Sequence, residues 1–331
     1  MLQRSVKNNS LLVVTAAVVM VCAFVTIAQA AVSQSITLHP GWNAVYLEVQ
    51  PEVRTPATLF KDLPVESVWT WYDRGTSIEF IRDPSEGLWA QPGWSVYTAD
   101  PAKAAAVNLF AIFANRAYLI KLGGSQNVTW TVTGAPATNK TVWNPNSFNL
   151  VGFHVNPATP PTFDGYFSLS AAHKGQPIYR LSSLGKWEPV ANPATTPIRS
   201  GEACWVYCNG SSGYQGVLKA QYLGSQLDFG TAMVMQSVTL TNNDPARSMN
   251  ATVRFQPAAE WLAYQYFNAT SGFYEYPKLD SMTMQLPGGV DSTLMLAVRR
   301  ELIATGVYLG TLEITDDVGS RIMIPVRVEK Q

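Results

Sequence analysis

The histidines are the first side chains to consider for acid–base chemistry, and the sequence contains three: His39, His154 and His173. His39 precedes a turn, His154 lies in an alternating segment, and His173 follows two alanines. None of them stands in a serine-hydrolase elbow, a zinc-binding H-E-x-x-H helix, a phosphate-binding glycine loop or a dinucleotide fingerprint. The sequence therefore carries no motif of these enzyme classes.

A glycan hydrolase would need two carboxylates, whose spacing along the sequence is unconstrained. Asp73, Asp83 and Glu86 are the candidates, but solvated loop charges explain them better. Nothing in the pattern pairs an acid with a base. We therefore expect no catalytic residue, no metal ion and no cofactor, with a secreted hydrolase that uses two carboxylates as the alternative.

Cys204 and Cys208 are candidate nucleophiles that lie four residues apart in an apolar segment. Four residues of straight strand span roughly 13 Å, whereas the Cα atoms of a disulfide lie within about 7 Å of each other. No Cys or His nearby completes a metal tetrad. We expect two reduced thiols that fill core positions and react slowly.

Aromatic side chains are abundant, with 10 Trp and 14 Tyr. Most lie in apolar strands, but Trp89 and Trp94 belong to E-G-L-W-A-Q-P-G-W-S-V-Y, which Pro and Gly interrupt, in an insertion around residues 83–110. Flat rings on a loop can bind sugars or proteins, and packing beneath their own loop is the alternative. Trp89 and Trp94 are the candidate ligand-binding residues, with a polysaccharide or another surface protein as the partner.

The elements that must position these side chains repeat along the chain. P-G-W-N-A-V-Y-L-E-V-Q-P (40–51) matches N-S-F-N-L-V-G-F-H-V-N-P (146–157), and 115–124 matches 201–210. The first match keeps a spacing of 106 along its whole length, which predicts a duplicated module, and the insertion in the first copy accounts for the smaller spacing of the second match. Alternation within both segments predicts a strand with the Val45 side on a core, so that Tyr46 and Glu48 lie on the other face. Asn43 and Asn149 start these strands and are expected to bind local backbone groups.

The N-terminus has the pattern of a signal peptide. Arg4 and Lys7 precede an apolar run over 11–27, and Ala-Gln-Ala at 28–30 supplies small residues for cleavage. An uncleaved anchor is the alternative, because the run is nearly long enough to span a bilayer. We expect a secreted, periplasmic or cell-surface location, and no stable membrane span after cleavage.

The charge content argues against nucleic acid as a partner. Removing Arg4 and Lys7 changes the formal net charge from 0 to −2. Charged residues make up 14% of the chain, against about 25% in average proteins. No basic patch is visible that would neutralise a phosphate backbone.

Short alternating segments between turn signals follow residue 218 and predict an immunoglobulin-like sandwich. They cover 237–243, 251–255, 293–298, 306–315 and 321–328. The segment D-D-V-G at 316–319 fits a hairpin turn better than a calcium loop, because it lacks spaced oxygen ligands.

Two segments of this region resemble known domains. L-D-F-G (227–230) followed by V-T-L-T-N-N (238–243) resembles the opening of hydin-like immunoglobulin domains of bacterial surface proteins, and G-V-Y-L-G-T-L-E-I-T (306–315) resembles the last hairpin of those domains and of BACON domains. The resemblance implies adhesion, spacing or carbohydrate contact, and no functional residue. The G-W-N segments resemble repeats of secreted bacterial proteins.

The expected fold is all-β. A signal peptide (1–30) precedes two copies of a β-module (31–137 and 138–220) and an immunoglobulin-like sandwich (221–331), with one short helix near 101–110 that Asp100 caps. The predicted function is a non-catalytic secreted or cell-surface-associated binding or spacer protein. A subunit of an extracellular assembly that pairs edge strands is a further alternative.

Overall fold

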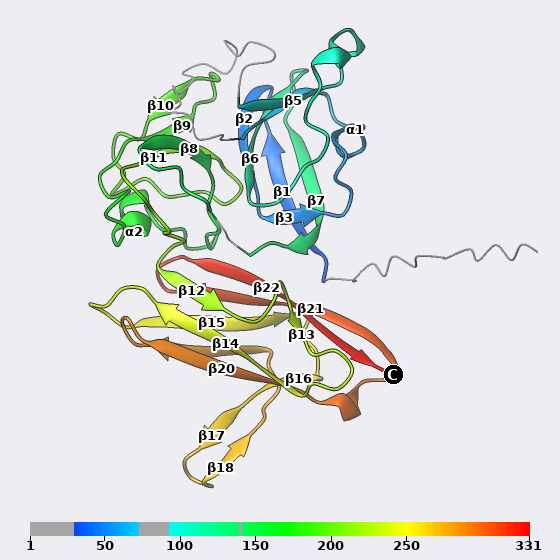
Figure 1. Ribbon diagram of the computed structural model, residues 1–331, viewed down its shortest axis with the longest axis vertical. Helices are drawn as coiled ribbons and strands as arrows, with labels where there is room; N and C mark the ends of the chain where they lie inside the picture. The colour runs from blue at the N-terminus through cyan, green and yellow to red at the C-terminus, as the bar shows by residue number, and fades with distance from the viewer. Residues whose placement is uncertain (1–29, 73–92, 139–140) are drawn as a thin grey trace, which may run out of the picture.

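The computed structural model describes residues 30–72, 93–138 and 141–331, and they form an all-β protein, as the sequence predicted. Two modules lie side by side above a sandwich (Figure 1). We call them the N-terminal module (30–138), the middle module (141–217) and the C-terminal sandwich (218–331). Trp89 falls in 73–92 and the apolar leader in 1–29, so both lie outside the described residues.

The N-terminal module contains a three-stranded sheet of order β1-β7-β3 and a four-stranded sheet of order β2-β6-β4-β5. Side chains from both sheets form one core, which Phe60 and Trp130 complete. The alternating burial along β7 is what a strand with one covered face requires. The elements are β1 (Val32–Leu38), β2 (Gly41–Leu47), β3 (Val49–Pro51), α1 (Pro56–Leu59), β4 (Val65–Trp71), β5 (Trp94–Thr98), η2 (Pro101–Ala106), β6 (Arg116–Leu122) and β7 (Val128–Pro136).

The middle module is built on one four-stranded sheet of order β10-β9-β11-β8. Its strands pair in the register of the N-terminal module: Val45 lies opposite Tyr118 in β2 and β6, and Val151 lies opposite Cys204 in β8 and β11. Segments that match in sequence thus occupy matching places in two sheets. The elements are β8 (Ser147–Val151), α2 (Phe163–Phe167), β9 (Ile178–Leu181), β10 (Trp187–Pro189) and β11 (Cys204–Cys208).

The C-terminal sandwich packs a four-stranded sheet, β12-β14-β20-β16, against a five-stranded one, β13-β22-β21-β15-β19. The predicted inward residues Leu296, Ile314 and Ile324 are fully buried in its core. The immunoglobulin-like sandwich is therefore present. The elements are β12 (Leu218–Gln221), β13 (Leu227–Asp228), β14 (Met235–Asn242), β15 (Met249–Gln256), β16 (Leu262–Tyr264), β19 (Ser281–Leu286), β20 (Asp291–Val298), η3 (Arg300–Leu302), β21 (Gly306–Asp316) and β22 (Arg321–Lys330).

A hairpin of β17 (Tyr266–Asn268) and β18 (Phe273–Glu275) extends from this sandwich as a separate two-stranded sheet (Figure 1). Phe267 pairs with Tyr274 across it, and both rings are more than half exposed. Isolated two-stranded sheets are at best marginally stable in water. The hairpin is thus an aromatic surface without a covering layer from the described chain.

Two boundaries differ from the sequence expectation. The Asp100 carboxylate caps the predicted helix by accepting the Ala102 N–H at 3.0 Å, but the element is a 3-10 helix that ends at Ala106, because Val107 is already extended. The strand β12 pairs with β14, so the sandwich begins before residue 221. The structure also contains the short α-helices α1 and α2.

The side of β2 that carries Tyr46, together with Glu48 directly after the strand, is the larger correction. Those side chains were expected to lie away from the core, yet their residues are only 2% and 1% exposed. They are covered by the middle module, where Gly152 packs directly on Tyr46. Both faces of β2 are therefore buried, one within its own module and one between modules.

The sandwich is attached to the middle module through the turn between β21 and β22. The Asn156 N–H donates to the Gly319 carbonyl at 2.9 Å. Gly319 has φ +100°, and a Cβ added there would lie 2.4 Å from the Thr159 carbonyl oxygen. Only glycine fits both constraints. The predicted hairpin turn is therefore also a docking element.

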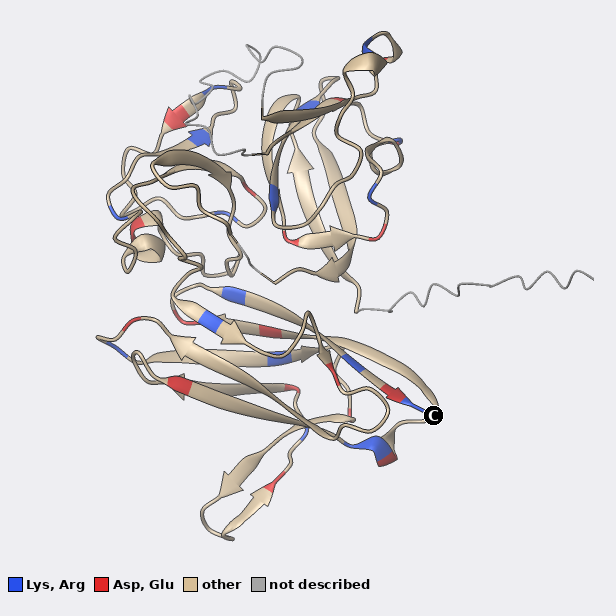
Figure 2. Cartoon of the chain, in the orientation of Figure 1, with Lys and Arg blue, Asp and Glu red and all other residues tan. Residues whose placement is uncertain are grey.

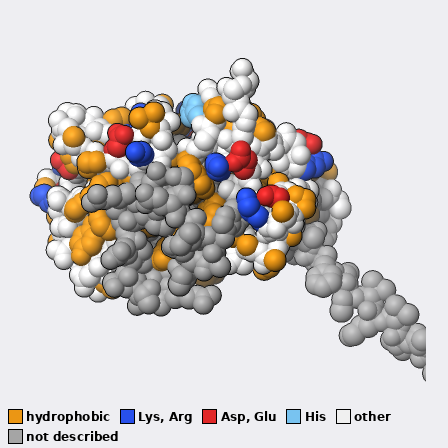
Figure 3. Space-filling model, turned by 90° about the horizontal axis from the view of Figure 1, so that it is seen from above, with side chains coloured by type: hydrophobic (Ala, Val, Ile, Leu, Met, Phe, Trp, Pro, Cys, Tyr) orange, Lys and Arg blue, Asp and Glu red, His pale blue; other side chains and the backbone are white. Residues whose placement is uncertain are grey.

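Lys, Arg, Asp and Glu are spread over all three modules rather than gathered on one (Figure 2). Seen from the side of the two modules, the described surface is mostly uncharged, with hydrophobic side chains among a few charged ones (Figure 3). Within residues 30–72, 93–138 and 141–331, no helix is long and apolar enough to cross a membrane.

Candidate functional site

Trp94, one of the two predicted ligand-binding residues, is not on a loop. It is the first residue of the edge strand β5 and is 7% exposed. Its ring centroid lies 5.2 Å from that of Trp71, 6.3 Å from that of Trp69 and 6.5 Å from that of Trp205. Trp94 therefore packs in the interface between the two modules instead of presenting a free ring.

This interface is an aromatic layer between the sheets β2-β6-β4-β5 and β10-β9-β11-β8. Edge-to-face contacts join its rings, as the charge distribution of aromatic faces and edges favours. The aromatic residues of this layer are Trp42, Trp69, Trp71, Trp94, Phe148, Tyr179, Trp187 and Trp205. The abundance of tryptophan noted in the sequence is thus explained largely by packing between modules.

Residues at matching positions of the two modules touch each other across this interface. Tyr46 packs on its counterpart Gly152, and Ala117 and Ala203 belong to one buried cluster. A backbone hydrogen bond also crosses the interface, from the Ala203 N–H to the Ala44 carbonyl at 3.1 Å. Contacts between equivalent residues are the property of an isologous, two-fold interface. Equivalent positions of the two modules therefore meet at two places in this interface.

Two grooves flank this interface, and equivalent positions line them. The first groove has a volume of about 420 Å³, and the second has a volume of about 360 Å³. The first is lined by Tyr46, Trp71, Tyr72, 114–117, Thr141, Val142, Asn144 and 149–151. The second is lined by 35–37, His39, Pro40, 42–45, 181–183 and 199–202.

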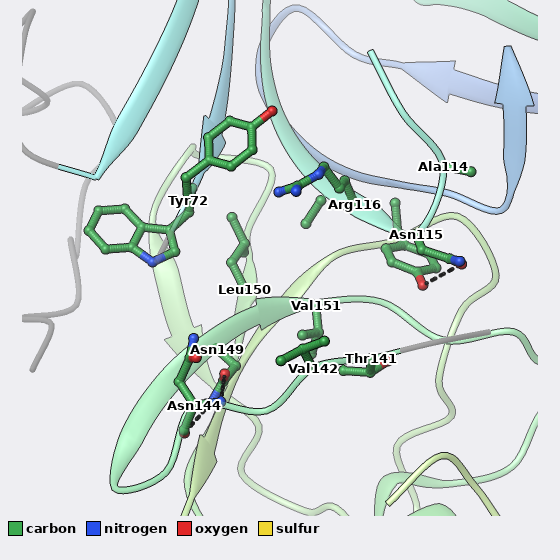
Figure 4. A pocket seen from close by; sticks show the side chains of 13 residues that line it. Tyr72, Ala114, Asn115, Arg116, Thr141, Val142, Asn144, Asn149, Leu150 and Val151 are labelled. Carbon is green, nitrogen blue, oxygen red and sulfur yellow. Dashed lines mark hydrogen bonds between the residues drawn. The ribbon is translucent and has the colours of Figure 1, made fainter. Parts of the chain in front are cut away.

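The grooves differ most at one pair of equivalent positions, which Arg116 and Glu202 occupy. In the second groove, Glu202 is neutralised by Arg180, whose Nε donates to Oε1 at 3.0 Å. In the first groove, the Arg116 guanidinium stacks on Tyr72 with its central carbon 4.2 Å from the ring centroid. No carboxylate among the described residues pairs with Arg116. The guanidinium points between the side chains of Tyr72 and Leu150 (Figure 4).

The amides around the first groove are held by the protein itself. Asn149 Oδ1 accepts the Asn144 N–H at 2.8 Å, and in the second groove the equivalent Asn43 Oδ1 accepts the His39 N–H at the same distance. The predicted structural role of Asn43 and Asn149 is thereby confirmed. Asn115 accepts a hydrogen bond from Tyr46 at 3.3 Å (Figure 4). Within the part of the lining that the structure describes, Arg116 is the one charged side chain.

A buried ionic cluster joins all three modules beside the interface. Glu48 of the N-terminal module accepts a hydrogen bond from Ser200 of the middle module at 2.6 Å and pairs with Arg321 of the sandwich. His154 of the middle module places Nδ1 3.8 Å from the same carboxylate, and its Nε2 lies 2.9 Å from Asn115 Oδ1. Burial lowers the pKa of His154, opposed by Glu48 and assisted by Arg321. Because Ser200 bonds to Glu48 rather than to His154, this is a structural cluster and not a nucleophile with its base.

A second serine–histidine pair is closed off within the middle module. Ser170 Oγ lies 2.6 Å from His173 Nδ1, and both residues are buried. The His173 ring centroid lies 4.0 Å from that of Trp143, and burial lowers the pKa of His173 to about 4. His173 Nε2 has no hydrogen-bond partner within the described chain, so no third group orients the imidazole.

The two cysteines are free and buried on β11. Burial raises the pKa of both thiols. Cys208 Sγ donates to the Gly210 carbonyl at 3.2 Å. The two cysteines therefore fill core positions as free thiols, as the sequence predicted, and burial disfavours the reactive thiolate form. In the described part of the chain, no three His, Cys, Asp or Glu side chains are grouped to hold a metal ion.

Tyr72 and Arg116 are the groove residues that sequence reasoning missed. A signal for them existed, because the match of 115–124 with 201–210 aligns Arg116 with Glu202. The two equivalent positions therefore carry opposite charges. The groove itself has no sequence signature, since it forms only where two modules meet.

The chain matches no protein-family model and no curated protein. Among solved structures it is similar to the periplasmic chaperone SfaE (13% identity, 34% of this chain, 57% of that chain, TM-score 0.21). It is also similar to the CsuC–CsuE chaperone–tip adhesion subunit complex of Acinetobacter baumannii (11% identity, 34% and 52% of the chains, TM-score 0.22). The VesB protease of Vibrio cholerae is 11% identical over 90% of this chain and 99% of that chain, with a TM-score of 0.22. This chain therefore covers little more than half the length of the SfaE and CsuC–CsuE chains that it matches.

Proposed function

We propose that this chain is an exported, non-catalytic binding protein, in which two modules of common origin and a sandwich form a rigid scaffold and the first groove takes the ligand. One observation carries the proposal. Arg116 is stacked on Tyr72 in a groove of about 420 Å³ and has no acidic partner among the described residues. Grooves of this size with aromatic walls and few polar groups are typical ligand sites.

The chemistry of the groove supports binding rather than turnover. Among the described residues, its lining contains no carboxylate and no histidine. Hydrolysis of a glycosidic bond needs an acid and a second carboxylate on either side of that bond. Glu48, the buried carboxylate nearest to the interface, is occupied by Arg321 and Ser200.

The location follows from the N-terminal segment. A signal peptide over 1–30 would deliver the chain to the periplasm, the cell surface or the medium. Polysaccharides and other surface proteins are the partners available there, and a saccharide suits the first groove because Tyr72 offers an aromatic wall. N-terminal sequencing of exported protein tests the cleavage, and a first residue at Ala31 is the expected result.

A glycan array tests the binding function, with wild type compared with Tyr72→Ala. Ser182→Ala, at the equivalent position of the second groove, is the matched control. Loss of the ring should weaken binding about tenfold, in line with about 1.4 kcal/mol of lost stacking. Ser182→Ala should bind like wild type. A wild-type protein that binds no glycan, or that cleaves one, would contradict the proposal. A Trp89→Ala variant on the same array tests the remaining sequence-based candidate.

The β17–β18 hairpin favours a second function, the binding of another protein. Its exposed side chains Tyr266, Phe267, Phe273 and Tyr274 are of the kinds enriched in protein interfaces. Light scattering over a range of concentrations, with wild type and a Phe273→Ser/Tyr274→Ser variant, tests self-assembly through it. An apparent mass that rises with concentration for the wild type but not for the variant would support the assembly of subunits through this hairpin.

A further inference from the structure

The first groove contains an electrostatic imbalance that identifies its ligand more closely. Arg116 is half-buried, and among the described residues that line the groove it is the one charged side chain. A cation that has lost part of its water without gaining a counter-ion is unfavourable. An anionic ligand would therefore gain binding free energy at this position.

The geometry selects a flat anion. A guanidinium presents its N–H donors as a planar fork that matches the two oxygens of a carboxylate. Stacking on Tyr72 at 4.2 Å limits the orientation of that fork. The donors are thus organised before the ligand arrives, which lowers the entropy cost of binding.

In the second groove, by contrast, the chain supplies both members of an ion pair. There Glu202, at the position equivalent to Arg116, is bonded by Arg180. The residue equivalent to Arg180 in the N-terminal module is Thr70, which is buried and donates to the Ala117 carbonyl at 2.9 Å. Among the described residues, one groove is therefore beside a complete guanidinium–carboxylate pair, and the other contains a guanidinium without a carboxylate.

The rest of the lining suits a hydroxylated ring. Tyr72 and Trp71 provide aromatic surface, and Thr141 and Asn144 add uncharged polar groups. We propose, on the basis of the binding function above, that the first groove binds a carboxylate-bearing saccharide of the uronic-acid class, with its carboxylate on Arg116 and its ring beside Tyr72.

Calorimetry with paired ligands tests this inference. Oligogalacturonate, oligoglucuronate and oligomannuronate are each compared with the same oligosaccharide after reduction of its carboxyl groups. Wild type should bind at least one acidic form at least tenfold more tightly than its reduced form, and the difference should shrink at high salt.

Variants assign the effect to the groove. Arg116→Gln should lose the preference for the acidic form, while Arg116→Lys should keep part of it, because the charge remains but the fork is lost. Arg199→Gln, which removes a cation that lines the second groove and is 68% exposed, should bind like wild type. Thermal unfolding of each variant shows whether it is folded.

The outcomes separate the two proposals. Equal binding of acidic and reduced forms, with loss of both in Tyr72→Ala, would overturn the uronic-acid inference and leave the binding function standing. A stronger preference for sulfated than for carboxylated saccharides would also overturn it. An Arg116→Gln variant that keeps the preference would place the anion elsewhere. Binding of no saccharide at all would end both proposals.

Discussion

Glu48 and His154 occupy the same position of the two matching segments, and they face each other across the module interface with Oε2 and Nδ1 3.8 Å apart. Arg321 of the sandwich reaches the same carboxylate. A position that repeats in the sequence has thus acquired two complementary side chains and a third partner from a different domain. The contact fixes the three modules relative to one another.

Replacing Glu48 by Gln should destabilise the protein. The variant leaves Arg321, which is only 16% exposed, without its carboxylate, and losing one partner of a buried ion pair costs about 3 kcal/mol or more. Urea unfolding measures the change. Glu52→Gln is the control because Glu52 is exposed, and equal midpoints for the two variants would contradict the role of Glu48.

Stability should fall on mild acidification. Burial lowers the pKa of His173 to about 4 and also lowers that of His154, from an ordinary value of 6.5. A histidine with a lowered folded-state pKa binds protons more readily when unfolded, so its stabilising contribution is complete above about pH 6.5 and is lost as the pH falls towards 4.

Thermal unfolding at a series of pH values between 7 and 4 checks this dependence. His173→Phe should flatten the profile, since it removes one of the two histidine titrations while keeping a ring in contact with Trp143. A variant with the same slope as wild type would assign the pH dependence to other groups.

Replacing Gly152 by Ala should weaken the module interface. The added Cβ would lie 2.3 Å from the Tyr46 Cβ and 2.8 Å from the Glu202 carbonyl oxygen, so the two modules must separate slightly. Overpacking of this kind costs about 1–3 kcal/mol. Gly213→Ala is the control, because nothing lies within 4 Å of its added Cβ. Calorimetric midpoints of the two variants give the comparison.

The thiols of Cys204 and Cys208 should resist modification. Both are buried, and burial raises their pKa, so little thiolate is present at neutral pH. A colourimetric thiol reagent should react slowly with native protein and rapidly, with two equivalents, in denaturant. This count applies to protein that has lost residues 1–30, because Cys22 lies in that segment. Fast reaction of the native protein would show that β11 opens.

Local patterns predicted the strands well. Alternation identified β2, β8 and the long strands of the sandwich, because a strand with one buried face must alternate. The match of 40–51 with 146–157 indicated equivalent strands, and their registers agree. Asn43 and Asn149 were assigned correctly because their bonds are to backbone only a few residues away.

The placement of Trp94 could not be obtained in the same way. Its sequence neighbours include Pro and Gly, which suggested a loop, but pairing with β4 makes it part of a strand. Its burial is decided by Trp205, more than one hundred residues away in the sequence. Sequence reasoning has no access to such a contact.

The sequence by itself determined the all-β class, the strand periodicity, the equivalence of the two modules' strands and the apolar nature of the cysteine strand, since each follows from local spacing and side-chain type. Only the tertiary structure decided that Tyr46 and Glu48 are buried, that Arg321 completes an ionic cluster, and that Arg116 lies in a groove without a carboxylate partner in the described chain. These features depend on which faces meet between modules, and a two-residue periodicity does not specify what covers the second face of a strand.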